Sequence, residues 1–246
     1  MSKLLLTLGF SAALVSLAAG QDNRVLPPAT MRGSLTAPAR RGTAPTIEKS
    51  SYYPPFCPPR SCLYYAGDFE TTYSGADGLF NANDEGASLE GQAWVGVKPA
   101  RDVTVTGVTF VQYFASGFGG TNPTPFAVQV GIKPGQAGTM VCSTSGNATL
   151  SAYGEFDPPT YSYTVKKLSK SCKLKRGTVY YVNLLPTSES SYGYITNVPP
   201  KAPPNHHGWK NDLNDCYFNG AAFRVDYGTC DSQGPFTELS IALTGN

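Results

Sequence analysis

The stretch VTVTGVTFVQYF, residues 103–114, decides the fold of this chain of 246 residues. Apolar and polar side chains alternate at its start, and alternation in an extended strand sends them to opposite faces of a sheet. The alternation changes phase at Gly107-Val108, and a glycine at such a point is typical of a β-bulge. The stretch therefore predicts one long, bulged strand with one face against a core.

Further runs of the same kind follow along the chain. They are FAVQVGI (126–132), TMVCSTSG (139–146), TYSYTV (160–165), TVYYVNLLP (178–186), AAFRVDYG (221–228) and FTELSIALTG (236–245). No long stretch has helical spacing, and 26 glycines and 20 prolines interrupt the chain at short intervals. We therefore predict an all-β fold, a single antiparallel β-sandwich that is jelly-roll-like, with about eight to ten strands.

The first twenty residues are typical of a signal peptide. Lys3 gives a positive start, and the apolar run from Leu4 to Leu17 is too short to span a bilayer. A buried N-terminal helix is the alternative, which Pro27 and Pro28 disfavour because they follow directly. We therefore expect a secreted or extracytoplasmic protein with no transmembrane segment in the mature chain.

Residues 21–56 are rich in Pro, Ala, Thr, Ser and Arg, and they contain few large apolar side chains. Such a composition buries too little surface to offset the entropy lost on ordering, so we predict a disordered or extended tail. The β-sandwich domain then covers residues 57–246. Acidic side chains slightly outnumber basic ones after residue 50, which argues against a nucleic-acid partner.

Six cysteines, an even number in an exported chain, indicate disulfides rather than free thiols. Their order along the chain suggests the pairs Cys57–Cys62, Cys142–Cys172 and Cys216–Cys230, although fifteen pairings are open. A zinc site is the rival interpretation, which the wide spacing of the cysteines disfavours.

The order of several motifs resembles a β-sandwich module of secreted bacterial proteins, which often occurs in proteins with varied surface anchors. The motifs are VTVTGVTF, AVQVGIKPGQAGTMV, TYSYTVKKL, CKLKRGTVYYVNLLP and LSIALTG, and the match covers roughly residues 93–245. The resemblance implies an extracellular, jelly-roll-like fold. It transfers no catalytic residue to this chain.

The stretch NHHGWKNDLNDC, residues 205–216, holds both histidines of the chain. Adjacent side chains of an extended segment point to opposite faces, so His206 and His207 do not readily bind one metal ion. We interpret the stretch as a loop tethered by Cys216, with Trp209 as a contact residue. Tyr192 and Tyr194 share one face of a short predicted strand, and we predict that they form a ligand-binding surface with Trp209.

A loop rich in acidic and amide side chains, residues 76–92, is a candidate calcium site. It departs from the EF-hand pattern because Gln92 replaces the glutamate that this pattern requires. A looser calcium site remains open, and so does a solvated loop without a metal. The candidate ligands are Asp77, Asn81, Asp84 and Glu85.

The segment KKLSKSCKLKR, residues 166–176, carries six cations in eleven residues. Such a segment attracts acidic polysaccharide or an anionic cell surface. The alternative is a solvated hairpin face whose lysines prevent unwanted strand pairing.

Signatures of catalysis are scarce. The chain has neither a G-x-S-x-G nor an H-E-x-x-H motif. We therefore predict a secreted, non-enzymatic module that binds a carbohydrate-like ligand or a cell-surface component and needs no cofactor except, as one option, calcium. Two alternatives stay open: a structural envelope protein that acts through its tail, and a glycan-directed hydrolase using carboxylates among Glu70, Glu90, Glu155, Glu189 and Glu238.

Overall fold

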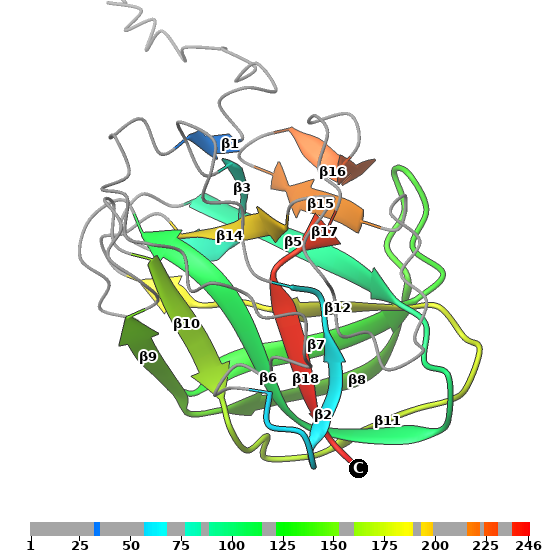
Figure 1. Cartoon of the computed structure of the whole chain (residues 1–246). Coiled ribbons are helices and arrows are strands. Elements are labelled where there is room, and N and C mark those ends of the chain that lie inside the picture. Colours follow the sequence, from blue (N-terminus) through cyan, green and yellow to red (C-terminus); the bar gives the residue numbers. More distant parts are fainter. Residues whose placement is uncertain are drawn as a thin grey trace, which may run out of the picture.

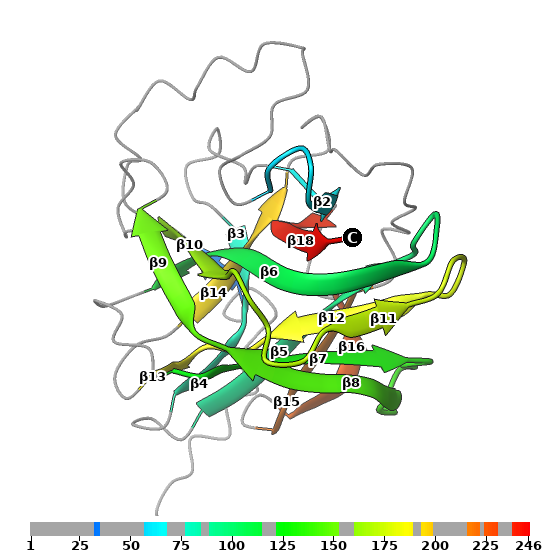
Figure 2. The same ribbon diagram turned by 90° about the horizontal axis from the view of Figure 1, so that it is seen from below.

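The computed structural model describes residues 32–34, 57–67, 77–84, 89–114, 122–152, 160–188, 193–198, 216–221, 224–230 and 238–246. These residues form eighteen strands and contain no α-helix. The strands make two sheets that pack face to face, which Figure 1 shows from the front and Figure 2 shows along the layers. The predicted all-β, disulfide-stapled sandwich is therefore confirmed.

The first sheet has ten strands and lies in front in Figure 1. Its members are β1 (Arg32–Ser34), β2 (Cys62–Tyr65), β3 (Asp77–Phe80), β6 (Val103–Phe114), β9 (Ala148–Ala152), β10 (Thr160–Val165), β11 (Cys172–Leu174), β14 (Gly193–Val198), β17 (Glu238–Leu239) and β18 (Ile241–Gly245). All pairs in this sheet are antiparallel among the described residues.

The second sheet has eight strands. Its members are β4 (Ala82–Asp84), β5 (Leu89–Val97), β7 (Thr124–Val130), β8 (Thr139–Gly146), β12 (Tyr180–Leu184), β13 (Thr187–Ser188), β15 (Cys216–Gly220) and β16 (Val225–Thr229). Within the described part of this sheet, β13 and β4 form the one parallel pair.

Strand β6 is the centre of the first sheet because it pairs with four other strands. One of its edges carries β11 at residues 103–105 and β10 at residues 108–113. The other edge carries β18 at residues 105–110 and β14 at residues 112–114. The twelve residues that the sequence indicated as one strand therefore organise most of the sheet.

The predicted bulge lies in β6 at Gly107. Opposite β18, Gly107 pairs with Thr244 but the next pair joins Val105 to Gly245, so β6 has one extra residue there. The bulge turns Val103 and Val105 into the core before it, and Val108 and Phe110 into the same core after it. It therefore explains the change of phase in the sequence.

The core lies between the two sheets. Phe110 of the first sheet meets Phe126 and Phe218 of the second in one apolar cluster, and all three are fully buried. Tyr163 also belongs to this cluster, and its hydroxyl bonds to the Thr124 hydroxyl at 2.8 Å. Burial raises the pKa of the Tyr163 phenol, which keeps it neutral inside the core.

More strands are present than the eight to ten expected, mainly because short strands such as β4, β9 and β13 lie outside the predicted runs. Ser240 separates β17 from β18 within the run predicted as one strand over 236–245, and its hydroxyl donates to the Gly67 carbonyl at 2.8 Å. Asn147 follows the predicted run 139–146 and separates β8 from β9, and the chain passes there from one sheet to the other.

The N-terminal predictions lie almost entirely outside the described residues, which include neither the signal peptide (1–20) nor most of the tail (21–56). Strand β1 falls within the tail range and pairs with β3. In the part of the chain that the structure describes, no helix is long and apolar enough to cross a membrane.

The three disulfides are Cys57–Cys62, Cys142–Cys172 and Cys216–Cys230, so the pairing suggested by their order is confirmed. Such bonds are typical of an oxidising compartment outside the cytoplasm. Cys142–Cys172 spans 30 residues and joins β8 of the second sheet to β11 of the first. Closing a loop of this length in the unfolded chain stabilises the fold by about 3–4 kcal/mol.

We predict that Gly107→Ala destabilises the protein by about 1–3 kcal/mol because the new methyl group has no room. An added Cβ would lie 2.5 Å from Thr244 Oγ1 and 2.9 Å from two backbone carbonyl oxygens. Urea unfolding monitored by tryptophan fluorescence measures the change, with Thr106→Ala as the neighbouring control. Equal stability of the two variants would contradict a closely packed bulge.

Candidate functional site

The predicted aromatic surface lies mostly beyond the described residues, which include neither Trp209 nor Tyr192. Tyr194 lies in β14, in register with Phe80 of β3 and Tyr113 of β6. Cys216, at the end of the loop 205–216, begins β15. The proposed grouping of Trp209 with the two tyrosines therefore stays a prediction.

A different aromatic cluster lies on the outer face of the second sheet. It consists of Trp94, Tyr181, Tyr217 and Tyr227, together with Ile132. Tyr217 pairs with Trp94 across β15 and β5, and the rings of Tyr181 and Tyr217 meet edge to face with centroids 5.3 Å apart. All five side chains are buried, so the cluster packs as a second core and offers no open stacking platform.

The sequence signal for this second core is the phase of the aromatic residues. Trp94 lies between Ala93 and Val95, and those two neighbours face the main core. Tyr181 lies in the same way between Tyr180 and Val182. An aromatic side chain between two core residues of a strand points to the outer face of the sheet, and it therefore signals that this outer face is covered.

Asn81, one of the predicted calcium ligands, lies in the interior between β3 and β4. Its side-chain oxygen accepts hydrogen bonds from Asn183 Nδ2 at 2.7 Å and from the Ala93 backbone N–H at 3.0 Å. Its Nδ2 donates to the Leu184 carbonyl at 2.8 Å. The Asn81 carboxamide thus supplies hydrogen-bond partners to buried backbone groups of β5 and β12, next to the start of β4.

Of the other three predicted calcium ligands, two lie in described strands. Asp77 begins β3 and Asp84 ends β4, while Glu85 lies outside the described residues. Within the described ranges, no three His, Cys, Asp or Glu side chains are close enough to hold a metal ion. The calcium site therefore stays a prediction.

Two of the five glutamates predicted as possible hydrolase carboxylates lie in described strands. Glu90 is exposed on β5 of the second sheet, and Glu238 begins β17 of the first. Glu70, Glu155 and Glu189 fall outside the residues that the structure describes. The alternative of a glycan-directed hydrolase stays a hypothesis.

The described surface with the clearest chemistry is the basic segment, residues 166–176. The chain leaves β10 beside Val108, crosses the open side of the sandwich, and pairs again with β6 as β11 at Val105. Leu168, Cys172 and Leu174 of this segment are buried in the main core, 1–4% exposed. The pattern K-K-L-S-K-S-C-K-L-K-R thus separates three inward anchors from six outward cations.

Contacts with both sheets hold the basic segment in place. The Leu168 N–H donates to the Thr106 carbonyl of β6 at 2.8 Å. On the side of β8, the Ser169 N–H and hydroxyl donate to the Ser145 carbonyl at 2.7 and 2.8 Å, and the Lys170 N–H donates to Thr144 Oγ1 at 2.9 Å. With the Cys142–Cys172 disulfide, these bonds fix the backbone that carries the cations.

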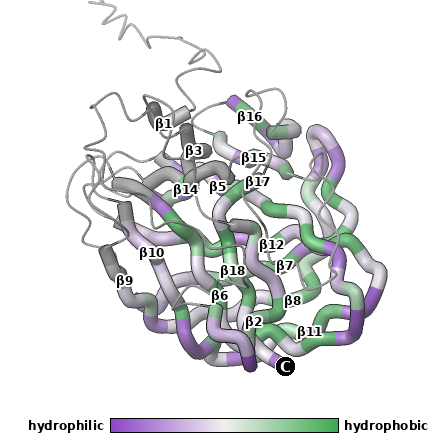
Figure 3. The backbone as a smooth tube through the Cα atoms, viewed as in Figure 1, coloured by the Kyte–Doolittle hydropathy of each residue, from purple (hydrophilic) through white to green (hydrophobic). Residues whose placement is uncertain are grey.

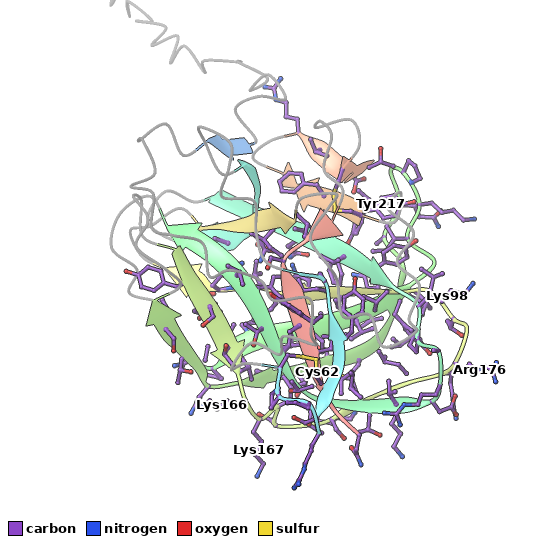
Figure 4. All side chains as sticks on the ribbon, viewed as in Figure 1. Cys62, Lys98, Lys166, Lys167, Arg176 and Tyr217 are labelled. Carbon is purple, nitrogen blue, oxygen red and sulfur yellow. A yellow bond between two sulfur atoms is a disulfide. The ribbon has the colours of Figure 1, made fainter. Side chains whose placement is uncertain are left out.

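The cations of the basic segment are Lys166, Lys167, Lys170, Lys173, Lys175 and Arg176, and all are exposed. Figure 4 shows Lys166, Lys167 and Arg176 pointing away from the ribbon along the end of the sandwich where the chain terminates. Figure 3 shows hydrophilic stretches along this end, next to hydrophobic strands. Arg60 and Arg101 are further exposed cations, in the loops that precede β2 and β6.

One acidic side chain, Asp102, acts on the basic segment within the described residues. Its carboxylate accepts from the Arg176 backbone N–H and from Lys175 Nζ, both at 2.8 Å. The hydrogen bond from the Arg176 backbone lowers the Asp102 pKa most, and the bond from Lys175 lowers it further. The bond to Asp102 in turn raises the Lys175 pKa. Since the Asp102 pKa is lower in the folded chain than in the unfolded chain, ionised Asp102 stabilises the fold at a pH above the usual carboxyl pKa. This stabilisation is lost as the pH falls through the lowered pKa.

Comparisons with known proteins add no relative: no family model matches the chain, and no curated protein and no solved structure is significantly similar to it. The resemblance to a secreted bacterial sandwich module therefore stays a prediction. The fold and the basic segment are the features from which a function can be inferred.

We predict that Asn81→Ala costs about 2–3 kcal/mol of stability, because it leaves the buried Ala93 N–H and Leu184 carbonyl without their side-chain partner. Thermal unfolding in calcium and in chelator measures the loss. A structural role requires the same loss in both solutions. A loss confined to the calcium solution would instead assign Asn81 to a metal site. Asn147→Ala, at an exposed position, is the matched control.

Proposed function

We propose that this protein is a secreted, non-enzymatic module that binds an anionic polysaccharide of the cell exterior through its basic segment. One observation carries the proposal: six exposed cations stand on a backbone fixed to both sheets, and one acidic side chain of the described residues partly neutralises them. Clustered exposed cations create a positive potential that attracts and retains polyanions.

The anchoring of the basic segment supports binding over a purely protective role. Lysines at a sheet edge also prevent pairing with another strand, but that role needs no fixed spacing of charges. Here Leu168, Cys172 and Leu174 fix the backbone before a ligand arrives. Little chain entropy is then lost on binding, which favours affinity.

The compartment agrees with this class of ligand. Three disulfides fit an oxidising environment, where polyanions of cell walls, capsules and matrices are largely carbohydrates. The resemblance to a module of surface proteins and the predicted signal peptide point in the same direction. Both support the proposal as sequence-based expectations.

The test uses the mature, oxidised chain and polygalacturonate as a carboxylated polymer, with dextran as the neutral polymer. We predict that Lys170→Gln/Lys173→Gln weakens binding of polygalacturonate by roughly three- to thirtyfold, since each exposed ion pair contributes up to about 1 kcal/mol. Calorimetry at low and at high salt measures the affinity, and high salt should weaken wild-type binding as well.

The matched control is Lys133→Gln/Arg224→Gln, which removes two positive charges away from the basic segment. It should bind within about twofold of the wild type, because charges beyond a Debye length of roughly 10 Å are screened. Asp102→Asn is the reciprocal variant: it keeps an acceptor for the Arg176 N–H, releases Lys175, and should tighten binding. Equal losses in both double variants, or no binding by the wild type, would refute the proposal.

A further inference from the structure

The outer face of the first sheet beside the basic segment carries hydroxyl groups. Lys173 pairs with Thr104 of β6, and its neighbours Cys172 and Leu174 point into the core. Side chains alternate along a strand, so Lys173 and Thr104 share the outer face. Thr106 lies on that face two residues further along β6.

The next strand continues this outer surface. On β18, Thr244 pairs with Gly107 of β6, and it accepts through its carbonyl a weak bond from Thr106 Oγ1 at 3.5 Å. Thr104, Thr106 and Thr244 are all half-buried, and we call them the hydroxyl strip. Gly245 follows Thr244, and an added Cβ there would collide with the Thr104 carbonyl and meet Leu63 of the core, so β18 lies close against β6 at this point.

A second cation flanks the hydroxyl strip on the side away from Lys173. The Gly245 N–H donates to the Ser61 carbonyl at 2.8 Å, and the adjacent Arg60 is exposed. The Cys57–Cys62 disulfide closes the loop that carries Arg60. From β11 across β6 and β18 to this loop are three strand spacings, or roughly 14 Å.

We infer that the hydroxyl strip, with Lys173 on one side and Arg60 on the other, recognises the sugar units of a linear acidic polysaccharide that lies across the strands. This inference rests on the proposed function and adds to it a second set of contacts. The cations take the carboxylates of the polymer, and the threonine hydroxyls exchange hydrogen bonds with its hydroxyl groups. A polyanion without hydroxyl groups uses the cations alone.

The composition of this surface favours a polysaccharide over an anionic lipid surface. Stable attachment to a bilayer by a basic patch is strengthened by apolar side chains that enter the membrane. In the described residues the exposed large apolar side chains are Met140 and Val141. They precede Cys142 on β8, which is bonded to the basic segment, and none lies on β6 or β18, which carry the hydroxyl strip. Beside Lys173 the surface instead presents threonines.

The test removes hydroxyl groups without changing charge or side-chain shape. Thr104→Val/Thr244→Val keeps β-branched residues that suit a strand, and Thr139→Val/Thr149→Val is the matched control at two other strand positions. Two ligands are compared by calorimetry: polygalacturonate, which has hydroxyl groups, and inorganic polyphosphate, which lacks them. Melting temperatures confirm that both variants are folded.

We predict that Thr104→Val/Thr244→Val weakens binding of polygalacturonate roughly tenfold and changes binding of polyphosphate less than twofold. Arg60→Gln should weaken binding of both polymers. If this threonine variant binds polygalacturonate like the wild type while Lys170→Gln/Lys173→Gln has lost affinity, the inference is overturned and the proposed function stands.

Two other outcomes would also overturn the inference. One is an equal loss of polyphosphate and polygalacturonate in Thr104→Val/Thr244→Val, which would mean that the hydroxyl groups do not read the sugar. The other is binding of vesicles containing phosphatidylglycerol more tightly than polygalacturonate by the wild type. That result would mean that the basic segment binds an anionic lipid surface.

Discussion

The pairing of β6 with four strands is the constraint on which the rest of the structure depends. A twelve-residue strand at the centre of a sheet must satisfy its N–H and C=O groups on both edges, and here β10, β11, β14 and β18 do so. The bulge at Gly107 lets the strand keep one apolar face against the core along its whole length. Without that extra residue, either Val103 and Val105 or Val108 and Phe110 would face solvent.

The basic segment is a consequence of the same arrangement. Both β10 and β11 pair with one edge of β6, so the chain between them must bridge a short gap on the open side of the sandwich. It does this by burying two leucines and a cysteine and by bonding to β8. The same contacts that join the segment to both sheets therefore also fix the backbone that presents the cations.

Sequence reasoning located the main strands well because their periodicity is local. The runs at 103–114, 139–146 and 160–165 match β6, β8 and β10 residue for residue. It did not separate the role of Asn81 from that of an acidic loop, because two partners of its carboxamide, Asn183 and Leu184, are 102 and 103 residues away in the chain. Side-chain satisfaction of this kind depends on long-range packing, which no local pattern encodes.

The sequence by itself determined the class of fold and the clustering of cations in residues 166–176, since both follow from short-range spacing. It suggested the disulfide pairs but left fifteen pairings open, and the structure selected among them. Tertiary structure alone decided that the aromatic cluster on the outer face of the second sheet is buried, while Thr104, Thr106 and Thr244 of the first sheet are only half-buried. It also brought Thr244 and Arg60, from distant parts of the chain, to the strand and the loop that follow β6 on the side away from Lys173. The physical reason is that strand pairing joins residues by hydrogen-bond register, and register is set by the packing of the whole sandwich.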